Sequence, residues 1–423
     1  MRAQQDPTDL LRLTRAKIAN SLDRLPKYMC TQTVDRSLYG ADLRDGSNVC
    51  DEALRERNTH VTSSDRLRLD VAMASAMEMY SWVGESRFSD RDLLDMVHEG
   101  AISTGSFASF LTGIFRTDDV NFTYNGEKQE NGREVAEFGF RIPYEMSNYI
   151  YGNGQYRVRT AWDGTFLVDA QSGDLVRLNV RTSRLPPQTG ACYASTALDY
   201  GRVRIKDSDF LLPTAAHLRI LKTDGGEADN RTVFSNCHEF LGESRLSFDS
   251  PPSAALTAAS DTRASQAASL PPGLYFKIAL TQGIDTATAA GGDPVRAKLI
   301  TPIQNRSKVL VPAGTPVLGR IVRLREYYGS QSAIALDIKL EKIDVGGGPV
   351  RLSALPEAGG RFQQTKSGTM HRRVEIGTLR GIEERAASFV FRDVTQPYLI
   401  GSGLESGWVT ARPEADAVSA APN

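Results

Sequence analysis

Apolar side chains recur every three or four positions between Gly105 and Arg116, and the opposite side of this segment carries small and polar residues. This spacing predicts an α-helix that buries one face. We expect the helix to begin at Ser103 or Thr104, whose hydroxyls can accept hydrogen bonds from the first free amides. The positions on its apolar face are Phe107, Phe110, Leu111, Ile114 and Phe115.

From Val120 onward, apolar and polar residues alternate, and turn sequences such as Asn125-Gly126 and Asp163-Gly164 separate the alternating runs. This pattern predicts an antiparallel meander with one apolar face. A change of phase at Gly201-Arg202 predicts a β-bulge that curves the sheet.

The apolar face of that sheet needs a cover, and we expect helix 105–116 to provide it. The helix can do so as ordinary packed core or as the lid of an apolar cavity that holds a lipid tail. We favour the lid, with a lining made of the five apolar helix residues and Trp82.

The chain before this region predicts one long helix followed by strands. Asp6-Pro7 is a strong helix start, because aspartate is a good N-cap and proline fits the first helical position. Pro26 ends the helix, and alternation then predicts a strand through Cys30. Residues 66–72 and 77–83 predict a hairpin.

A second β-rich unit is predicted after a segment rich in Ala, Ser and Pro. Its strands are interrupted by Gly- and Pro-containing turns, and Phe389, Phe391 and Trp408 are expected to complete its core. We predict four parts: a domain at 1–249, a linker at 250–272, a domain at 273–410 and a disordered tail at 411–423. The fold class is mainly β (α+β). It combines an open antiparallel barrel wrapped on helices with a second small β-barrel or sandwich.

The net charge and the length of the apolar runs limit the classes of partner that we expect. Fifty Lys and Arg residues against 51 Asp and Glu residues give a net charge of −1, so no global attraction to nucleic acid is encoded. No apolar run approaches the length that crosses a bilayer, so we do not expect a membrane-spanning protein.

Four cysteines occur, and none forms a Cys-x-x-Cys pair. We expect two disulfides, Cys30 with Cys50 and Cys192 with Cys237, because each pair encloses one strand-loop-strand unit. Disulfides imply an oxidising compartment, hence a periplasmic or secreted protein. Residues 1–5 contain no apolar segment, which indicates a trimmed signal peptide or a start codon assigned too late. The alternative is a cytosolic protein with four buried thiols.

Three short stretches resemble an uncharacterised family of secreted bacterial proteins: Leu25 to Gln32, Gly100 to Gly105 and Phe234 to Cys237. The order of elements over residues 6–245 is similar to the LolA/LolB lipoprotein-carrier fold. That resemblance implies an open barrel with an apolar concave face, and it transfers no functional residue.

The second unit resembles the C-terminal barrel of TrbI-type conjugal-transfer proteins. The resemblance rests on Leu274 to Asp285, Asp293 to Leu299 and Val309 to Thr315 followed by Leu318-Gly319. The chain departs from that family because it shows neither a transmembrane anchor nor a long proline-rich spacer.

No catalytic, metal or cofactor constellation is recognisable. The five histidines are scattered singly, and Gly401-Ser402-Gly403 lacks the spacing of a nucleophile elbow. We therefore expect that the protein is not an enzyme. A hydrolase ranks third among the functions considered, after the two that follow. The leading hypothesis is an envelope protein that binds or carries an apolar ligand such as a lipid or a lipoprotein acyl chain. The alternative is a structural or assembly component that docks on an envelope protein through its β domains.

Overall fold

The computed structural model describes residues 6–42, 50, 59–74, 77–85, 88, 93–97, 99–117, 120–153, 155–240, 270–329, 332–345, 348–357, 374–376, 385–394 and 397–413. The chain divides into two compact units, Met1–Leu241 and Gly242–Asn423. Strands dominate both units, so the mainly β fold class is confirmed. The predicted linker positions 250–269 and tail positions 414–423 lie outside the described residues.

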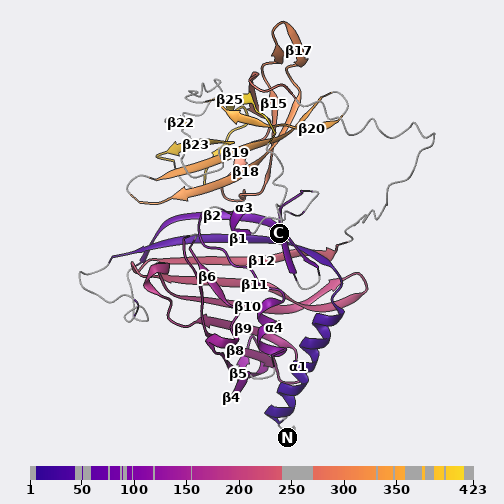
Figure 1. Cartoon of the computed structure of the whole chain (residues 1–423), viewed down its shortest axis with the longest axis vertical. Coiled ribbons are helices and arrows are strands. Elements are labelled where there is room, and N and C mark those ends of the chain that lie inside the picture. Colours follow the sequence, from indigo (N-terminus) through magenta and orange to yellow (C-terminus); the bar gives the residue numbers. More distant parts are fainter. Residues whose placement is uncertain are drawn as a thin grey trace, which may run out of the picture. The chain divides into compact units, whose positions relative to one another are not determined.

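Unit 1 is one large antiparallel sheet with helices against it and a separate two-stranded hairpin of β6 and β7 (Figure 1). Its elements are α1 Pro7–Arg24, β1 Tyr28–Ala41, β2 Thr59–Ala74, β3 Met77–Trp82, α3 Leu93–Met96, α4 Ser109–Phe115, β4 Asn121–Glu130, β5 Arg133–Ile142, η1 Tyr144–Met146, β6 Ile150–Gly152, β7 Arg157–Arg159, β8 Trp162–Asp169, β9 Leu175–Thr182, η2 Pro187–Thr189, β10 Ala191–Ile205, β11 Ser208–Lys222 and β12 Glu227–Glu239.

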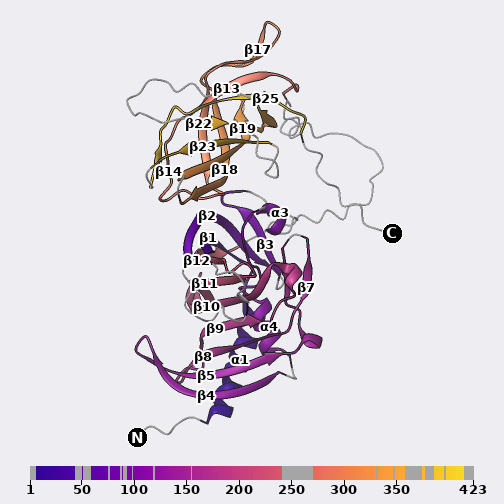
Figure 2. The ribbon, with the colours of Figure 1, turned by 90° about the vertical axis from the view of Figure 1, so that its left-hand side faces the viewer.

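The pairings give the strand order β3-β2-β1-β12-β11-β10-β9-β8-β5-β4, and every pair is antiparallel. The first strand of the chain therefore lies beside the last strand of the unit. Figure 2 shows these strands following one another, with α1 and α4 lying against the sheet. One core contains apolar residues of both helices and of the sheet, such as Leu10, Ile114 and Phe166. Each helix thus buries its apolar face on the sheet.

The first helix follows the sequence prediction. Asp6 is its N-cap, and the Thr8 amide donates to the Asp6 side chain at 2.8 Å. The helix ends at Arg24, two residues before Pro26. The predicted hairpin is also confirmed, because β2 pairs with β3.

The helix expected from Ser103 or Thr104 is shorter than predicted. The α4 helix begins at Ser109, and residues 106–108 form a turn instead. Gly105 has a φ of +89°, which interrupts a right-handed helix at that point. The amides of the turn are also already bound to a side chain of β3, as described below.

The bulge lies on the strand opposite the predicted one. The register of β10 and β11 shifts between Asp199 and Tyr200, which pair with Ala215 and Pro213. The extra residue is therefore Thr214 of β11. The side chain of Thr214 comes so close to Gly201 that a Cβ at Gly201 would lie 3.0 Å from its methyl group.

The predicted disulfide pairing is wrong. Cys30 is bonded to Cys237, and Cys50 is bonded to Cys192. Because β1 and β12 are neighbours, Cys30 and Cys237 have Cα atoms 4.1 Å apart although 207 residues separate them in the sequence. Pairing by proximity in the sequence failed because the sheet joins its first strand to its last. The number of disulfides, two, is as expected, and the disulfides favour an oxidising compartment.

Unit 2 is a small all-β domain. Its strands are β13 Tyr275–Leu280, β14 Ile284–Asp285, β15 Pro294–Leu299, β16 Ile303–Asn305, β17 Lys308–Val311, β18 Pro316–Tyr327, β19 Ala333–Asp344, β20 Pro349–Arg351, β21 Ala354–Pro356, β22 Val374–Ile376, β23 Ala386–Arg392, β24 Leu399–Ile400 and β25 Glu405–Thr410.

The strands of unit 2 pair in a circuit. β19 pairs with β18, and the pairing continues through β15, β13 and β25 to β21. The stretch 349–356 closes the circuit, because its first half (β20) pairs with β19 and its second half (β21) pairs with β25. Phe389, Phe391 and Trp408 are buried in the core of the unit, as predicted.

Candidate functional site

The residues predicted to line a cavity all lie in or against the core of unit 1. Phe110, Leu111, Ile114 and Phe115 are buried on α4, and Phe107 is buried in the preceding turn. Trp82 on β3 is partly buried and packs against the same core. The structure therefore brings the six predicted residues to one region, and their role in binding a ligand stays a prediction.

Aromatic rings surround the turn and the α4 helix on the sheet side. The ring centroid of Phe107 lies 4.8 Å from that of Phe234 and 5.8 Å from that of Tyr28. Phe110 lies 5.8 Å from Trp162. At the other end of the helix, Phe115 lies 5.0 Å from Phe166. These edge-to-face contacts make the region the aromatic centre of the unit.

A carboxylate on β3 holds the start of this segment. Glu78 accepts hydrogen bonds from the Gly105 amide at 2.7 Å and from the Phe107 amide at 2.9 Å. The Tyr80 hydroxyl donates to the same carboxylate at 2.5 Å. Amides at the start of a helical segment have no partner within it, so an ionised acceptor stabilises them strongly.

A buried ion pair holds the chain a few residues earlier. Arg36 on β1 and Asp65 on β2 make two parallel contacts at 2.6 and 2.8 Å, and their side chains are only 8% and 3% exposed. Arg36 also donates to the Glu99 carbonyl at 2.7 Å. Asn230 on β12 donates to the Ala101 carbonyl at 2.7 Å. The segment that leads into α4 is thus fixed from β1 and β12 here and from β3 through Glu78.

The other end of α4 contacts the N-terminal helix. Arg15 of α1 donates to the Phe115 carbonyl at 3.4 Å, and Arg116 forms an ion pair with Asp23. Because carbonyls at a helix C-terminus lack partners within the helix, the guanidinium of Arg15 satisfies one of them.

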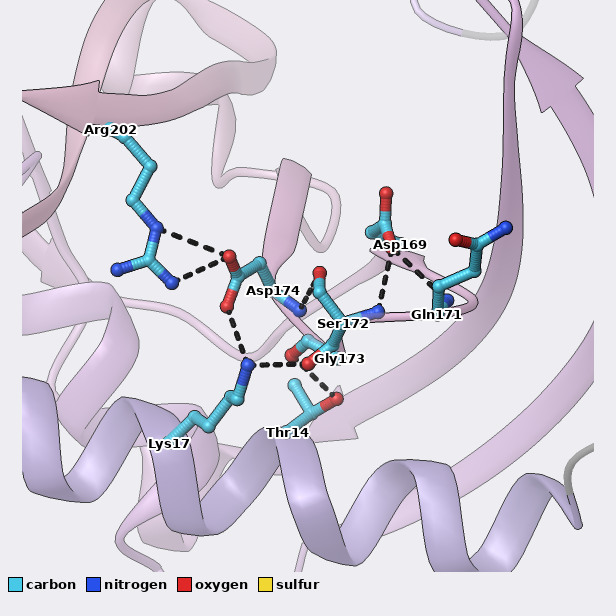
Figure 3. Close-up of polar contacts among 8 residues, drawn as sticks. All are labelled: Thr14, Lys17, Asp169, Gln171, Ser172, Gly173, Asp174 and Arg202. Carbon is cyan, nitrogen blue, oxygen red and sulfur yellow. Dashed lines mark hydrogen bonds and ion pairs between the residues drawn. The ribbon is translucent and has the colours of Figure 1, made fainter.

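The N-terminal helix is itself attached to the turn between β8 and β9 (Figure 3). Lys17 donates to the Ser172 carbonyl at 2.5 Å and to Asp174 at 3.0 Å, and Arg202 of β10 binds the same carboxylate at 2.6 Å. Thr14 donates to the Gly173 carbonyl at 3.2 Å. Burial raises the pKa of Asp174, but the hydrogen bonds and charges of Arg202 and Lys17 outweigh burial and lower that pKa below its usual value.

Several buried polar atoms of unit 1 have no hydrogen-bond partner among the described residues, and three of them belong to aromatic side chains of this core. They are the hydroxyls of Tyr28 and Tyr200 and the indole nitrogen of Trp162. The side chains are 1%, 8% and 1% exposed, respectively. Tyr28 touches Phe107 and Trp162 touches Phe110, so both lie directly against the α4 segment.

Both phenols are neutral donors. Burial raises the pKa of Tyr28 and Tyr200 well above the usual value, and the negative charge of Glu78 raises both further. The buried indole of Trp162 is likewise a donor only. The interior of unit 1 therefore offers hydrogen-bond donors in apolar surroundings, next to one carboxylate.

The sequence analysis missed Glu78, Arg36, Asn230 and the tyrosines. One signal for Arg36 was present: it continues the buried alternation of Tyr28, Cys30 and Val34, where a charge needs a buried partner. The pattern could not show which partner, because Asp65 belongs to another strand.

The described part of the chain contains no group of three or more His, Cys, Asp or Glu side chains placed to hold a metal ion. Within the same residues, no helix is long and apolar enough to span a membrane.

No protein-family model matches this chain, and no curated protein matches it.

The solved structures that match this chain include three of low identity. A DUF1329 family protein from Desulfovibrio piger is 9% identical, with a TM-score of 0.27, over 58% of this chain and 98% of that protein. A domain named as an outer membrane lipoprotein-sorting protein, from Vibrio parahaemolyticus, is 8% identical, with a TM-score of 0.27, over 55% and 92%. The lipoprotein LppX of Mycobacterium tuberculosis is 10% identical, with a TM-score of 0.19, over 56% and 99%. These values do not assign the chain to a family.

Proposed function

We propose that unit 1 is a non-enzymatic binding or carrier module of the bacterial cell envelope, and that it shelters the acyl chain of a lipid or lipoprotein. The observation that carries the proposal is the set of unpartnered donors on Tyr28, Tyr200 and Trp162. A buried hydroxyl without a partner costs about 1–3 kcal/mol, and phenylalanine would fill the same space without that cost. A ligand that brings a hydrogen-bond acceptor removes the cost.

The charges around the donors define the kind of acceptor. Glu78 is coupled electrostatically to both phenols, so a second carboxylate at this place would be repelled. A neutral acceptor, such as the carbonyl of an acyl ester, suits the donors better than the carboxylate of a free fatty acid. The apolar part of the ligand would lie among Phe107, Phe110 and the rings of Tyr28 and Trp162 that contact them.

The α4 helix acts as the lid in this proposal. Its ring contacts with Trp162 and Phe166 fill the apolar face of the sheet, so a ligand can enter only when the helix moves away. The chain before the helix stays attached, because Glu78 and the pair of Arg36 and Asp65 hold residues 99–107 to the sheet. Movement is thereby confined to the segment after Phe107, and it requires the contacts of Arg15 with the Phe115 carbonyl and of Arg116 with Asp23 to break.

The test measures binding of a fluorescent acyl ester and of the corresponding free acid. We expect the ester to bind more tightly. Tyr28→Phe and Tyr200→Phe should each weaken ester binding about five- to tenfold, since one neutral hydrogen bond contributes about 1 kcal/mol. Tyr124→Phe, at an exposed tyrosine of β4, is the matched control.

Native mass spectrometry of protein purified from a membrane-containing host provides an independent readout. Co-purified lipid supports the carrier. Protein that carries no lipid and binds neither probe would overturn the proposal, and would favour the alternative of an assembly component that binds envelope proteins.

A further inference from the structure

The chain between β5 and β8 leaves the large sheet and forms a separate small element. It consists of η1 and the hairpin of β6 and β7, in which Ile150 pairs with Arg159, Tyr151 with Val158 and Gly152 with Arg157. We call residues 144–153 and 155–159 the side hairpin. Figure 2 shows β7 beside the sheet of unit 1, separate from its strands.

The side hairpin is attached both at its base, through Ser147, and at its turn, through Asn153. Ser147 donates to the Thr160 carbonyl at 2.6 Å, and the Asn153 side chain donates to the Thr189 carbonyl at 3.0 Å. Tyr149 is in ring contact with Phe110 of the α4 helix at 5.9 Å and with Trp162 at 6.1 Å. Whatever binds the side hairpin is therefore brought next to α4.

The two faces of the hairpin differ. Tyr151 and Val158 share one face and pack against a small apolar cluster that includes Leu185 and Leu218. Ile150 and Arg159 occupy the other face, and both are exposed. A two-stranded hairpin needs only one buried face, so the apolar residue on the outer face is not explained by folding.

Exposed apolar and aromatic residues are concentrated here. Tyr144 is 55% exposed, Met146 36%, Ile150 54% and Tyr156 48%, all within thirteen positions. Elsewhere among the described residues of unit 1, large apolar side chains of similar exposure, such as Met77 and Val233, occur singly. Exposed apolar side chains that are concentrated in one element indicate an interaction surface.

Positive charge borders this patch. Arg157 and Arg159 flank Ile150 and Tyr156, and the guanidinium of Arg159 lies 5.9 Å from the ring centre of Tyr144. No carboxylate among the described residues forms an ion pair with either arginine. Glu145 is the one acidic residue in the sequence of the hairpin.

We propose that the side hairpin is a membrane-contact surface that docks unit 1 on a lipid bilayer containing anionic headgroups. Tyrosine, methionine and isoleucine enter the interfacial layer, where an apolar body and a polar tip are both accommodated. Arg157 and Arg159 bind the phosphates of the headgroups. Exposed apolar side chains occur here together with arginines that form no ion pair with a described residue. This combination fits an anionic lipid surface better than a soluble partner.

Co-sedimentation of the full chain with vesicles tests this, without any ligand for the interior. Phosphatidylethanolamine vesicles with and without phosphatidylglycerol are compared at low and high salt. We expect binding to the vesicles that contain phosphatidylglycerol, and weaker binding at high salt. Arg157→Gln and Arg159→Gln should each weaken it about fivefold, and Ile150→Ser with Tyr156→Ser about tenfold or more.

Two controls lie on the same unit. Val233→Ser changes an apolar residue of matching exposure (55%), and Arg204→Gln changes an exposed arginine of β10. Both should bind vesicles like the parent. Circular dichroism confirms that the hairpin variants are folded, which is expected because the substituted side chains are exposed.

A parent protein that stays in the supernatant with both kinds of vesicle overturns the proposal and assigns the surface to a protein partner. Vesicle binding that the hairpin variants leave unchanged overturns it as well. Because no acyl ligand is used, these outcomes are independent of whether the interior binds one.

Discussion

The carboxylate of Glu78 accepts a hydrogen bond from the Phe107 amide at 2.9 Å, so a strand near the edge of the sheet holds the first turn of the segment that covers the sheet's apolar face. Glu78 is partly buried and also binds the Gly105 amide. These two contacts join Glu78 to amides that lie 27 and 29 positions later in the sequence. They fix the turn that precedes α4.

Removing that carboxylate should loosen α4. We expect Glu78→Ala to lower the free energy of unfolding by about 2–3 kcal/mol, because hydrogen bonds to a charged acceptor contribute more than neutral ones. Glu78→Gln keeps an acceptor and should lose less. Urea denaturation measures both, and equal losses in the two variants would contradict a role for the charge.

The cysteine pairing gives a second prediction. Peptide mapping without reduction should recover the Cys30 peptide joined to the Cys237 peptide. Cys30→Ala and Cys237→Ala should each cost about 2–5 kcal/mol, and the double variant no more than either single one, because one bond is lost in all three. Recovery of Cys30 with Cys50 would restore the pairing expected from the sequence.

The aromatic residues of the α4 segment should separate into two kinds. Phe115 stacks among Phe122 and Phe166, so Phe115→Ala should cost about 3–5 kcal/mol with little effect on a bound probe. Phe107 lies against Tyr28, beside the unpartnered donors. Phe107→Ala should weaken binding of an acyl ester. If both variants are strongly destabilised and the parent binds no probe, the segment is ordinary packed core and does not bind a ligand.

The pH dependence of stability should show the attachment of α1. The folded pKa of Asp174 is lowered from the unfolded value of 3.8, so its ionised form stabilises the fold. This stabilisation is complete above pH 3.8 and is lost as the pH falls below 3.8 through the lower, folded pKa.

The measurement for Asp174 compares parent and Asp174→Asn by denaturation from about pH 6 to about pH 2. The difference in unfolding free energy should be constant at the upper end and shrink at the acid end. Asp9→Asn, at an exposed carboxylate of α1, is the control. A difference that stays constant across the range would exclude a stabilising charge at Asp174.

Local patterns predicted what depends on neighbours along the chain. The N-cap at Asp6 and the alternation in β1 each involve residues within a few positions of one another. The turns predicted at Asn125-Gly126 and Asp163-Gly164 are wrong, because these residues lie inside β4 and β8. The partners of Cys30, Arg36 and Phe107 could not be predicted this way. Each belongs to a strand that the register of the sheet brings alongside, and a pattern within one strand carries no information about its neighbour.

The same limit applies to the candidate site. The apolar face of α4 was visible in the sequence because helical spacing reveals it. The hydroxyl of Tyr200 was not, since an inward-facing tyrosine and an inward-facing phenylalanine give the same alternation. Only the surroundings of the hydroxyl distinguish them.

The bond between Cys30 and Cys237 has a mechanical consequence. It joins the first and last strands of unit 1, so 207 positions of sequence lie inside one covalent ring. Tension applied between the chain before Cys30 and the chain after Cys237 passes through two sulfur atoms and bypasses the meander. A force probe should therefore stretch α1 and the segment after β12 while the sheet carries no load, and the sheet should begin to extend under force only after a reductant has opened the ring.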